Sequence, residues 1–271
     1  KEIGYFSFTV KAAEEIRNRV AGENMSENEL KKMYPYFCTL HSLAYKRLRL
    51  EPHEIMDELD YMELSDMTGR KFVNKMKKGN GMDFSMPTAQ SQYQDTINLA
   101  YAKYPHDEDR LPRIFKEVKL SDYGARNTIL QMDKDLKNFK RDRHKLEYVD
   151  YFNTFLETKN PPNLKYLFID EAQDLSAHQW MVVDMIQKVS QPIETYVAGD
   201  DDQAIFRWAG ADIEHFINMA NDKNNTIMPL KQSYRVPKSV HTLATKMAQS
   251  ISNRIDKQYN PRDDEGERKV L

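Results

Sequence analysis

The sequence has few of the features that would assign it to a class at once. One residue in 271, Cys38, is a cysteine, which excludes an internal disulfide and is typical of a reducing compartment. Its neighbours favour a strand, so we expect a buried packing thiol rather than a nucleophile. No apolar run approaches the roughly 20 residues of a membrane-spanning helix, and no secretory signal is recognisable. We therefore expect a soluble, cytoplasmic protein.

An excess of charge of one sign is also missing. The chain has 40 Lys and Arg against 42 Asp and Glu, a formal net charge of -2, so nucleic acid could be attracted only by a local patch. The seven histidines show no metal-ligand spacing, which makes a zinc site improbable. The length allows one large domain or two ordinary ones.

Two short apolar runs in the middle of the chain end in acidic residues. Residues 166–169 lead into Asp170 and Glu171, and residues 195–199 lead into three successive aspartates that begin at Asp200. Unbroken apolar runs of this length favour strands that are buried on both faces of a parallel sheet. Ligands bind at the carboxyl ends of such strands. The pattern predicts a site for a metal-bound polyphosphate at this edge.

Strand and helix patterns alternate on both sides of a helical stretch. Residues 3–8 and 36–39 favour strands, and Thr9 is placed to cap a helix after the first of them. From about residue 51 to 145 we find helical spacing and no convincing buried strand. We expect an α/β sheet interrupted by a mostly helical insert.

The alternation resumes near Tyr148. A helix over residues 177–189 would join the two acid-tipped strands, and residues 226–230 favour a further, weaker strand. An apolar helical face follows Pro237, and we expect a loop in the charged tail over residues 260–268.

Six of the twelve positions from Lys134 to Lys145 are Lys or Arg. They could form a solvated helix face or contact the phosphates of a nucleic acid, and the sequence leaves both interpretations open.

The residue types at the acidic edge favour a particular chemistry. A strand-end Asp170 suits Mg²⁺, and Glu171 could polarise a water, although an acid pair can also cap a helix. The three acids need a cation or a basic partner nearby. Gln203 is uncharged and can donate and accept hydrogen bonds, so it can follow a phosphate whose charge changes.

Aromatic and basic residues follow closely. Phe206 and Trp208 offer stacking surfaces for unpaired bases, or they are two core aromatics. Arg235, just before a helix, could contact phosphate oxygens or form a structural ion pair.

Together these segments resemble the motifs of UvrD/Rep/PcrA-type superfamily 1 DNA helicases. The segment over residues 168–176 looks like the Walker B motif, residues 198–211 like motif III, and residues 230–235 like motif IV. Residues 7–13 resemble motif Ia and residues 39–42 motif Ib, with Val10 and Leu40 where the family usually has Asn and Phe.

The resemblance implies a RecA-like parallel sheet with flanking helices, a P-loop NTPase lobe that carries a helical subdomain. Residues 1–50 and 146–230 would form this first lobe, residues 51–145 the insert, and residues 231–271 the start of a second lobe. It also implies an ATP-dependent helicase or translocase that uses ATP and Mg²⁺ on single-stranded DNA or a single-strand/duplex junction, in DNA repair or replication.

Site residues carry over position by position. Asp170 would hold Mg²⁺, Glu171 would activate water, Gln203 and Arg235 would contact the γ-phosphate, and Tyr234 and Asp200 would line the cofactor site. The remaining positions would contact DNA: Phe8, Lys11, Thr39, His41, Phe206, Arg207 and Trp208.

The sequence contains no Gly-x-x-x-x-Gly-Lys-Ser/Thr phosphate loop and no later helicase motifs. We therefore expect a fragment that is inactive alone. A non-catalytic DNA-binding or scaffold module derived from this fold, and the helicase part of a helicase–nuclease, remain alternatives.

Overall fold

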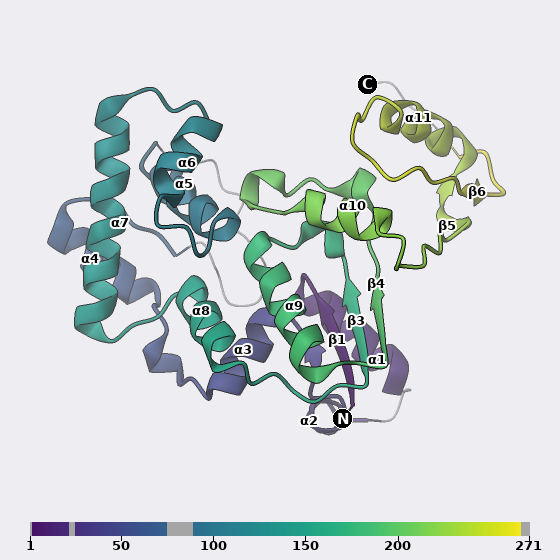
Figure 1. Ribbon diagram of the computed structural model, residues 1–271, viewed down its shortest axis with the longest axis horizontal. Helices are drawn as coiled ribbons and strands as arrows, with labels where there is room; N and C mark the ends of the chain where they lie inside the picture. The colour runs from purple at the N-terminus through teal and green to yellow at the C-terminus, as the bar shows by residue number, and fades with distance from the viewer. Residues whose placement is uncertain (1, 22–24, 75–88, 267–271) are drawn as a thin grey trace.

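The computed structural model describes residues 2–21, 25–74 and 89–266, and a parallel sheet lies at the centre of its main lobe (Figure 1). The order of its strands is β2-β1-β3-β4, and each neighbouring pair is parallel. The strands are β1 (Ile3–Ser7), β2 (Phe37–Cys38), β3 (Tyr166–Asp170) and β4 (Glu194–Val197). This arrangement confirms the predicted α/β fold class.

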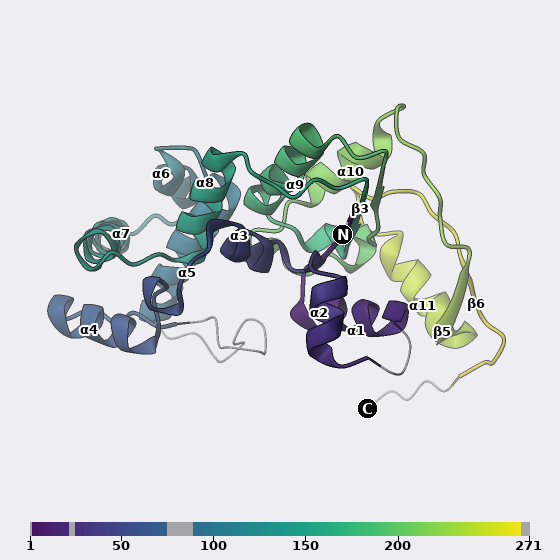
Figure 2. The same ribbon diagram turned by 90° about the horizontal axis from the view of Figure 1, so that it is seen from below.

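Helices lie on both sides of the sheet (Figure 2). Those of the main lobe are α1 (Val10–Ala21), α2 (Glu27–Met33), α3 (Leu40–Leu48), α8 (Tyr148–Thr158), α9 (Ala177–Ser190) and α10 (Ile213–Asn221). The main core forms where Leu167 and Ile169 of β3 join Phe6 and the helical residues Phe152, Phe155 and Trp180, all almost fully buried. None of these helices, nor any other in the described ranges, is long and apolar enough to span a membrane.

The expectation that both acid-tipped strands are buried on both faces is wrong for β4 and holds on only one face of β3, whose Tyr166 is 37% exposed. Strand β4 lies at the edge of the sheet, and its Tyr196 is 43% exposed. Phe168 and Tyr196 stack on each other on the less covered face, with ring centroids 4.9 Å apart. Cys38 is buried as expected, and burial raises the pKa of its thiol to about 11.

Side-chain oxygens start several helices directly after the strands. Thr9 accepts a hydrogen bond from the Ala12 amide at 3.2 Å, which confirms the predicted cap of α1. Thr39 caps α3, and Ser176 with Gln179 forms a capping box at the start of α9. The strand-to-helix turns therefore lie at the carboxyl edge of the sheet.

The helical region has a core of its own. It consists of α4 (Glu58–Thr68), α5 (Ala89–Lys103), α6 (Arg110–Glu117), α7 (Tyr123–Arg143) and the short 3₁₀ turn η1 (Pro52–Glu54). Leu64, Ile97, Ile114 and Ile129 are buried among these helices, separately from the main core. The region projects to the left of the sheet in Figure 1.

Short 3₁₀ turns and a small C-terminal unit complete the described chain. The turns η2 (Ala172–Asp174), η3 (Asp201–Gln203) and η4 (Arg207–Ala209) follow β3 and β4, and the unit comprises β5 (Gln232–Pro237), α11 (Lys238–Ala248) and β6 (Asn260–Arg262). The strand predicted over residues 226–230 is wrong, since the chain there is irregular and Leu230 is 89% exposed. Part of the predicted tail loop is strand β6, which pairs with β5.

Candidate functional site

The predicted acidic residues meet at the carboxyl edge of the sheet. Asp170 ends β3 and lies opposite Ser7 of β1 in the strand register. Beyond the last strand pair, the Ala198 amide donates to the Ile169 carbonyl at 2.8 Å and the Ala172 amide donates to the Ala198 carbonyl at 3.0 Å. The segments that follow β3 and β4 are therefore held together just where the acids begin.

Gln173 joins these two segments through its side chain. Its amide nitrogen donates to Glu171 Oε2 at 2.8 Å, and its Oε1 accepts from the Asp200 amide at 3.1 Å. Gln203 in turn donates to the Asp200 carboxylate. A continuous path of hydrogen bonds thus runs Glu171–Gln173–Asp200–Gln203. Sequence reasoning gave Gln173 no role, although its position between two acids was a usable signal.

Asp170 has a partner on the neighbouring strand. The Tyr5 hydroxyl donates a hydrogen bond to Asp170 Oδ2, and burial together with this carboxylate raises the pKa of Tyr5. Ser7, opposite Asp170, is buried, and its hydroxyl has no hydrogen-bond partner among the described residues. Tyr5 and Ser7 were not predicted, because their alternation along β1 gives no sign of the residue across the sheet.

Glu171 leaves the strand in an unusual backbone conformation. Its φ of 53° lies in the left-handed region, which non-glycine residues rarely adopt. The residue is exposed, whereas the next three residues are buried. One of these is Asp174, whose pKa is raised to about 6 by burial and by the charge of Glu171. The turn presents the Glu171 carboxylate outward beside Asp170.

The three successive aspartates have the basic partners that their charge requires. Lys257 Nζ contacts all three carboxylates, and Arg254 forms a two-bond contact with Asp202 at 2.9 and 2.7 Å. Burial acts to raise the pKa of Asp202, but the hydrogen bonds from these two bases lower it. Sequence reasoning called for a basic partner and did not find it, because it lies more than 50 residues along the chain.

Two of the predicted DNA-contacting aromatic residues lie together next to the acidic edge. The rings of Phe8, just after β1, and Phe206, just before η4, are 5.5 Å apart. Arg207 is exposed and forms an ion pair with Glu214 at 3.0 Å. The backbone of Trp208 lies in η4, but its side chain is outside the described part of the structure.

Thr39 and His41 are engaged in the interior. Thr39 is buried and its hydroxyl caps α3. The His41 ring stacks on Phe152 at 4.3 Å and meets Tyr148 and Tyr151 edge-on, and burial lowers its pKa to about 4. This packing does not offer the ring to a base, so a DNA contact of His41 stays a prediction without support from the geometry.

The remaining predicted residues, Lys11, Tyr234 and Arg235, are exposed. Tyr234 in β5 is 85% exposed, and Lys11 lies in the exposed first turn of α1. No hydrogen bond or ion pair joins the side chain of Arg235 to the acidic edge within the described residues. The structure therefore brings Asp170, Glu171, Asp200 and Gln203 together, whereas no hydrogen bond or ion pair among the described residues joins Tyr234 or Arg235 to them.

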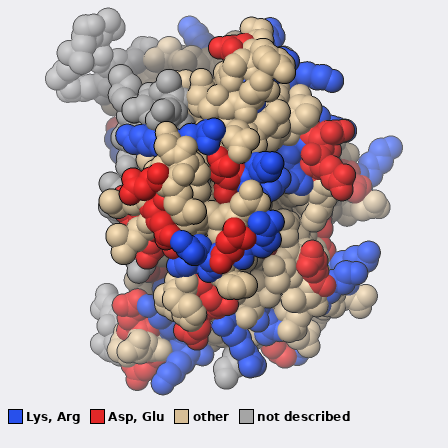
Figure 3. Space-filling view, turned by 90° about the vertical axis from the view of Figure 1, so that its left-hand side faces the viewer, with Lys and Arg blue, Asp and Glu red and all other residues tan. Residues whose placement is uncertain are grey.

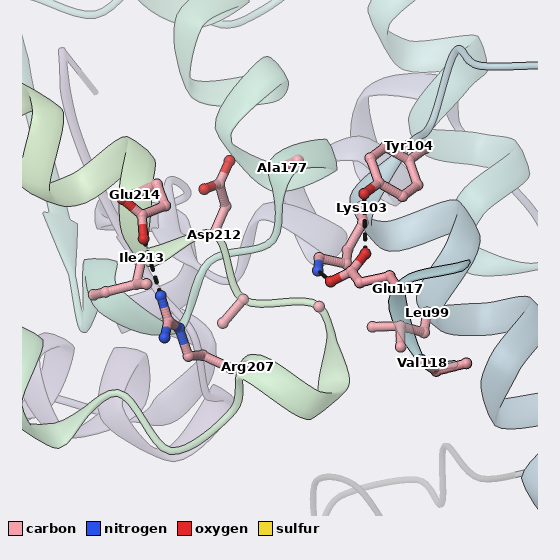
Figure 4. A pocket seen from close by; sticks show the side chains of 12 residues that line it. Leu99, Lys103, Tyr104, Glu117, Val118, Ala177, Arg207, Asp212, Ile213 and Glu214 are labelled. Atoms are coloured by element: carbon pink, nitrogen blue, oxygen red, sulfur yellow. Dashed lines mark hydrogen bonds and ion pairs between the residues drawn. The ribbon is translucent and has the colours of Figure 1, made fainter. Parts of the chain in front are cut away.

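A cavity of about 630 Å³ separates the helical region from the segment around Arg207 (Figure 4). Lys103 pairs with Glu117 on one wall, and Arg207 pairs with Glu214 on the other. Since each of these bases faces an acid, the cavity has no excess positive charge for a phosphate backbone.

The basic residues of 134–145 are largely neutralised as well. Lys137 pairs with Asp133 at 2.7 Å and Lys145 with Asp60 at 2.8 Å, while Lys140 contacts both Glu147 and Asp150. Figure 3 shows acidic and basic side chains interspersed over this side of the molecule. The geometry favours a helix whose basic residues are paired with acids, with Lys140 and Lys145 largely buried, over a nucleic-acid contact.

The acidic edge fits Mg²⁺ only in combination with another ligand. Among the described residues no three His, Cys, Asp or Glu side chains are grouped to hold a metal ion. Mg²⁺ commonly keeps several waters and takes one or two carboxylates plus phosphate oxygens. Asp170, with the unpartnered Ser7 hydroxyl opposite it, matches that limited requirement.

Comparison with known proteins shows which family the sequence resembles. The chain is similar to the ATP-dependent DNA helicase PcrA of Leuconostoc citreum, 23% identical over 265 residues, which cover 93% of this chain and 33% of that protein. The PcrA helicase of Bacillus subtilis (strain 168) is 35% identical over 103 residues, 38% of this chain and 14% of that protein. A PcrA helicase of Staphylococcus epidermidis is 25% identical over 93% of this chain and 34% of its own length.

Two of these PcrA helicases match most of the length of this chain, and the chain spans about a third of the length of each of them. Residues 1–224 match the UvrD/REP helicase N-terminal domain, and the chain therefore belongs to the UvrD/Rep helicase family.

Proposed function

We propose that this chain is part of an ATP-dependent DNA helicase or translocase, in which the carboxyl edge of the sheet binds Mg²⁺ and ATP. The observation that carries the proposal is the hydrogen-bonded path Glu171–Gln173–Asp200–Gln203. It links the acids of two neighbouring strands at the edge where parallel sheets bind their ligands. The relatives described as ATP-dependent DNA helicases support the same assignment.

Each side chain at the edge has a role that its geometry supports. Asp170 would hold Mg²⁺, which would neutralise charge on the phosphate oxygens. The exposed Glu171 would accept a proton from the attacking water, and the exposed amide of Gln203 would hydrogen-bond the γ-phosphate. Asp200 would line the nucleotide site. Tyr234 and Arg235 would contact the nucleotide from the C-terminal unit.

DNA would pass beside the same edge. Phe8 and Phe206 form a ring pair there, and Phe206 follows Gln203 by three residues. Stacking of a base on such a ring contributes about 1–3 kcal/mol. Loss of the γ-phosphate would therefore alter the position of Gln203 and, three residues later, that of Phe206 against the DNA. We include Lys11, Arg207 and Trp208 in this surface.

The proposal extends to the parts of the chain. Residues 1–50 and 146–230 would form the first RecA-like lobe, residues 51–145 its inserted subdomain, and residues 231–271 the start of a second lobe. The 271 residues contain no phosphate loop. ATP turnover is therefore proposed for the whole protein in which this chain lies, not for these residues alone.

The first prediction tests the role of Glu171 in the whole protein. Glu171→Gln removes the proton acceptor but keeps a side chain of the same size, so hydrolysis of ATP should fall by about 100-fold or more while nucleotide binding is retained. The measurements are steady-state ATP hydrolysis with and without single-stranded DNA, and nucleotide binding by fluorescence.

Glu157→Gln, at an exposed position of α8, is the matched control and should hydrolyse ATP normally. Hydrolysis that is indifferent to DNA in the unsubstituted protein, or that survives Glu171→Gln, would contradict the proposal. DNA binding without any hydrolysis would instead favour a scaffold.

A further inference from the structure

Residues 253–257, which we call the docking segment, connect the C-terminal unit to the main lobe. Asn253 donates to Glu214 of α10 at 2.7 Å, and the Ile255 amide donates to Asp201 at 2.7 Å. The side chain of Ile255 packs against the main core. The segment is therefore anchored by polar contacts and by apolar burial.

The contacts of the docking segment converge on the three aspartates of residues 200–202. Lys257 Nζ lies 2.9 Å from Asp200 Oδ1 and 3.2 Å from Asp202 Oδ2, and it also contacts Asp201. Arg254 adds its paired contact to Asp202. Two positive charges thus face three negative ones, and the Asp201 side chain is only 2% exposed. Without these bases, three adjacent carboxylates would repel one another in a poorly solvated turn.

The carboxylate of Asp200 links Lys257 to Gln203. Lys257 binds Oδ1 of Asp200, and the Gln203 amide nitrogen donates to Oδ2 of the same carboxylate. The Asp202 amide also donates to Oδ1 at 3.2 Å. The orientation of the Gln203 amide consequently depends on Asp200, and that of Asp200 depends on Lys257.

We propose that Lys257 is a positioning residue that holds Asp200, and through it Gln203, in the orientation needed for hydrolysis. The inference rests on the proposed function of the sheet edge. It makes the alignment of Gln203 conditional on docking of residues 253–257, which follow α11 and belong to the C-terminal unit. Displacement of that unit from the main lobe would withdraw the ammonium and release the amide.

The direct test is hydrogen exchange of the peptide that covers residues 200–206, measured by mass spectrometry. Lys257→Met should speed exchange of this peptide by about tenfold, because the Asp202 amide loses the fixed Asp200 carboxylate that accepts its hydrogen bond and the turn around it loosens. Lys257→Arg keeps the charge and should restore most of the protection. Lys238→Met is the matched control, since Lys238 pairs with the exposed Glu265 at 3.8 Å, away from the aspartates.

Steady-state kinetics of the whole protein provide the functional test. Lys257→Met should lower kcat for ATP hydrolysis by about tenfold and change KM by less than about threefold, because the substrate contacts remain and only alignment is lost. Lys257→Arg should recover kcat, and Lys238→Met should match the unsubstituted protein.

The outcomes separate this inference from the proposed function. No ATP hydrolysis in the unsubstituted protein would refute the proposed function. Normal hydrolysis there, with kcat unchanged in Lys257→Met, would refute the positioning role alone. Exchange that is unchanged in Lys257→Met, or equally fast in Lys238→Met, would refute it as well.

A second variant serves if Lys257→Met does not fold. Arg254→Lys keeps the positive charge but loses the planar fork on Asp202, so exchange of the same peptide should rise by about threefold. An unchanged rate in this folded variant would overturn the inference.

Discussion

At the scale of single residues, the site depends on a close approach between Gln173 and Gly199. Gln173 is almost completely buried and uses both ends of its amide to join the segments after β3 and β4. A Cβ on Gly199 would lie 2.7 Å from Gln173 Oε1 and 3.2 Å from the Gln173 backbone nitrogen. Only a residue without a side chain leaves room for this bridge.

We therefore expect Gly199→Ala to destabilise the protein. The added methyl group would also press on Phe216 at 3.0 Å, and overpacking of this kind costs about 1–3 kcal/mol. The measurement is the free energy of unfolding in urea. Gly124→Ala, at the start of α7, meets only Asp122 Oδ1 at 3.3 Å and should be neutral or stabilising. Equal stability of the two variants would contradict the expectation.

Part of this site could be predicted from the residue types in the sequence, and part could not. Asp170, Glu171 and Asp200 were predictable because each follows an apolar run that forms a strand on local grounds. Lys257 was not, since a lysine in a charged tail carries no sign of the carboxylates it will meet.

At the scale of elements, α7 and α8 are joined by a buried ionic cluster. Lys140 of α7 contacts Glu147 at 3.0 Å and Asp150 at 2.7 Å, and the Tyr61 hydroxyl donates to Glu147 at 2.5 Å. The Lys140 side chain is only 11% exposed. These contacts fix the place where the helical region returns to the main lobe.

Lys140→Met should therefore lower the free energy of unfolding by about 3 kcal/mol. This is the lower end for breaking a buried pair, chosen because Asp150 keeps some exposure to water. Lys134→Met, at an exposed position of the same helix, should change stability by less than about 0.5 kcal/mol. Thermal or urea unfolding of both variants gives the comparison, and similar losses in the two would refute the argument.

Strands with a clear apolar pattern were predictable even where their partner is far away, as β1 and β3 show, whereas strands without that pattern were not. The strand predicted over residues 226–230 rested on β-branched and apolar residues. The strand that forms is the next segment, β5 (Gln232–Pro237), because it is β5 that pairs with β6. Strand β6 itself contains Pro261 in a charged tail, a composition typical of a loop. Only the long-range pairing makes it a strand.

At the scale of the whole molecule, the main lobe and the helical region have separate cores, and α5 of the helical region lies against η4 of the main lobe. Gly210, with φ 99°, lies against α5, where an added Cβ would come within 2.7 Å of the Ala102 Cβ. The sequence predicted a sheet with a helical insert, but it could not predict this contact, because it depends on the shapes of two surfaces that lie more than 100 residues apart in the sequence.

Two histidines in packed surroundings, the partly buried His41 and the buried His178, should make stability depend on pH. Burial lowers the pKa of His41 to about 4, and burial with the positive charges of His106, His41 and Arg110 lowers that of His178 to about 3. Both values lie below the 6.5 of a free histidine, so the unfolded chain binds more protons as the pH falls. Stability should be complete above pH of about 7 and fall by about 2 kcal/mol per histidine towards pH 5.

Unfolding in urea at several pH values checks this prediction. His178→Gln should flatten the dependence on pH between about 5 and 7, whereas His53→Gln, at an exposed position, should leave it unchanged. A slope that is identical in all three proteins would show that other groups control it.

The contact between Arg254 and Asp202 also limits how this sequence can evolve. Loss of Arg254 would leave Asp202 with Lys257 as its remaining base among the described residues, whereas loss of Asp202 would leave the Arg254 guanidinium without its carboxylate partner. Selection should therefore favour exchanges at the two positions that restore charge balance over single substitutions. Homologous sequences should therefore record their history as correlated replacements across a 52-residue separation.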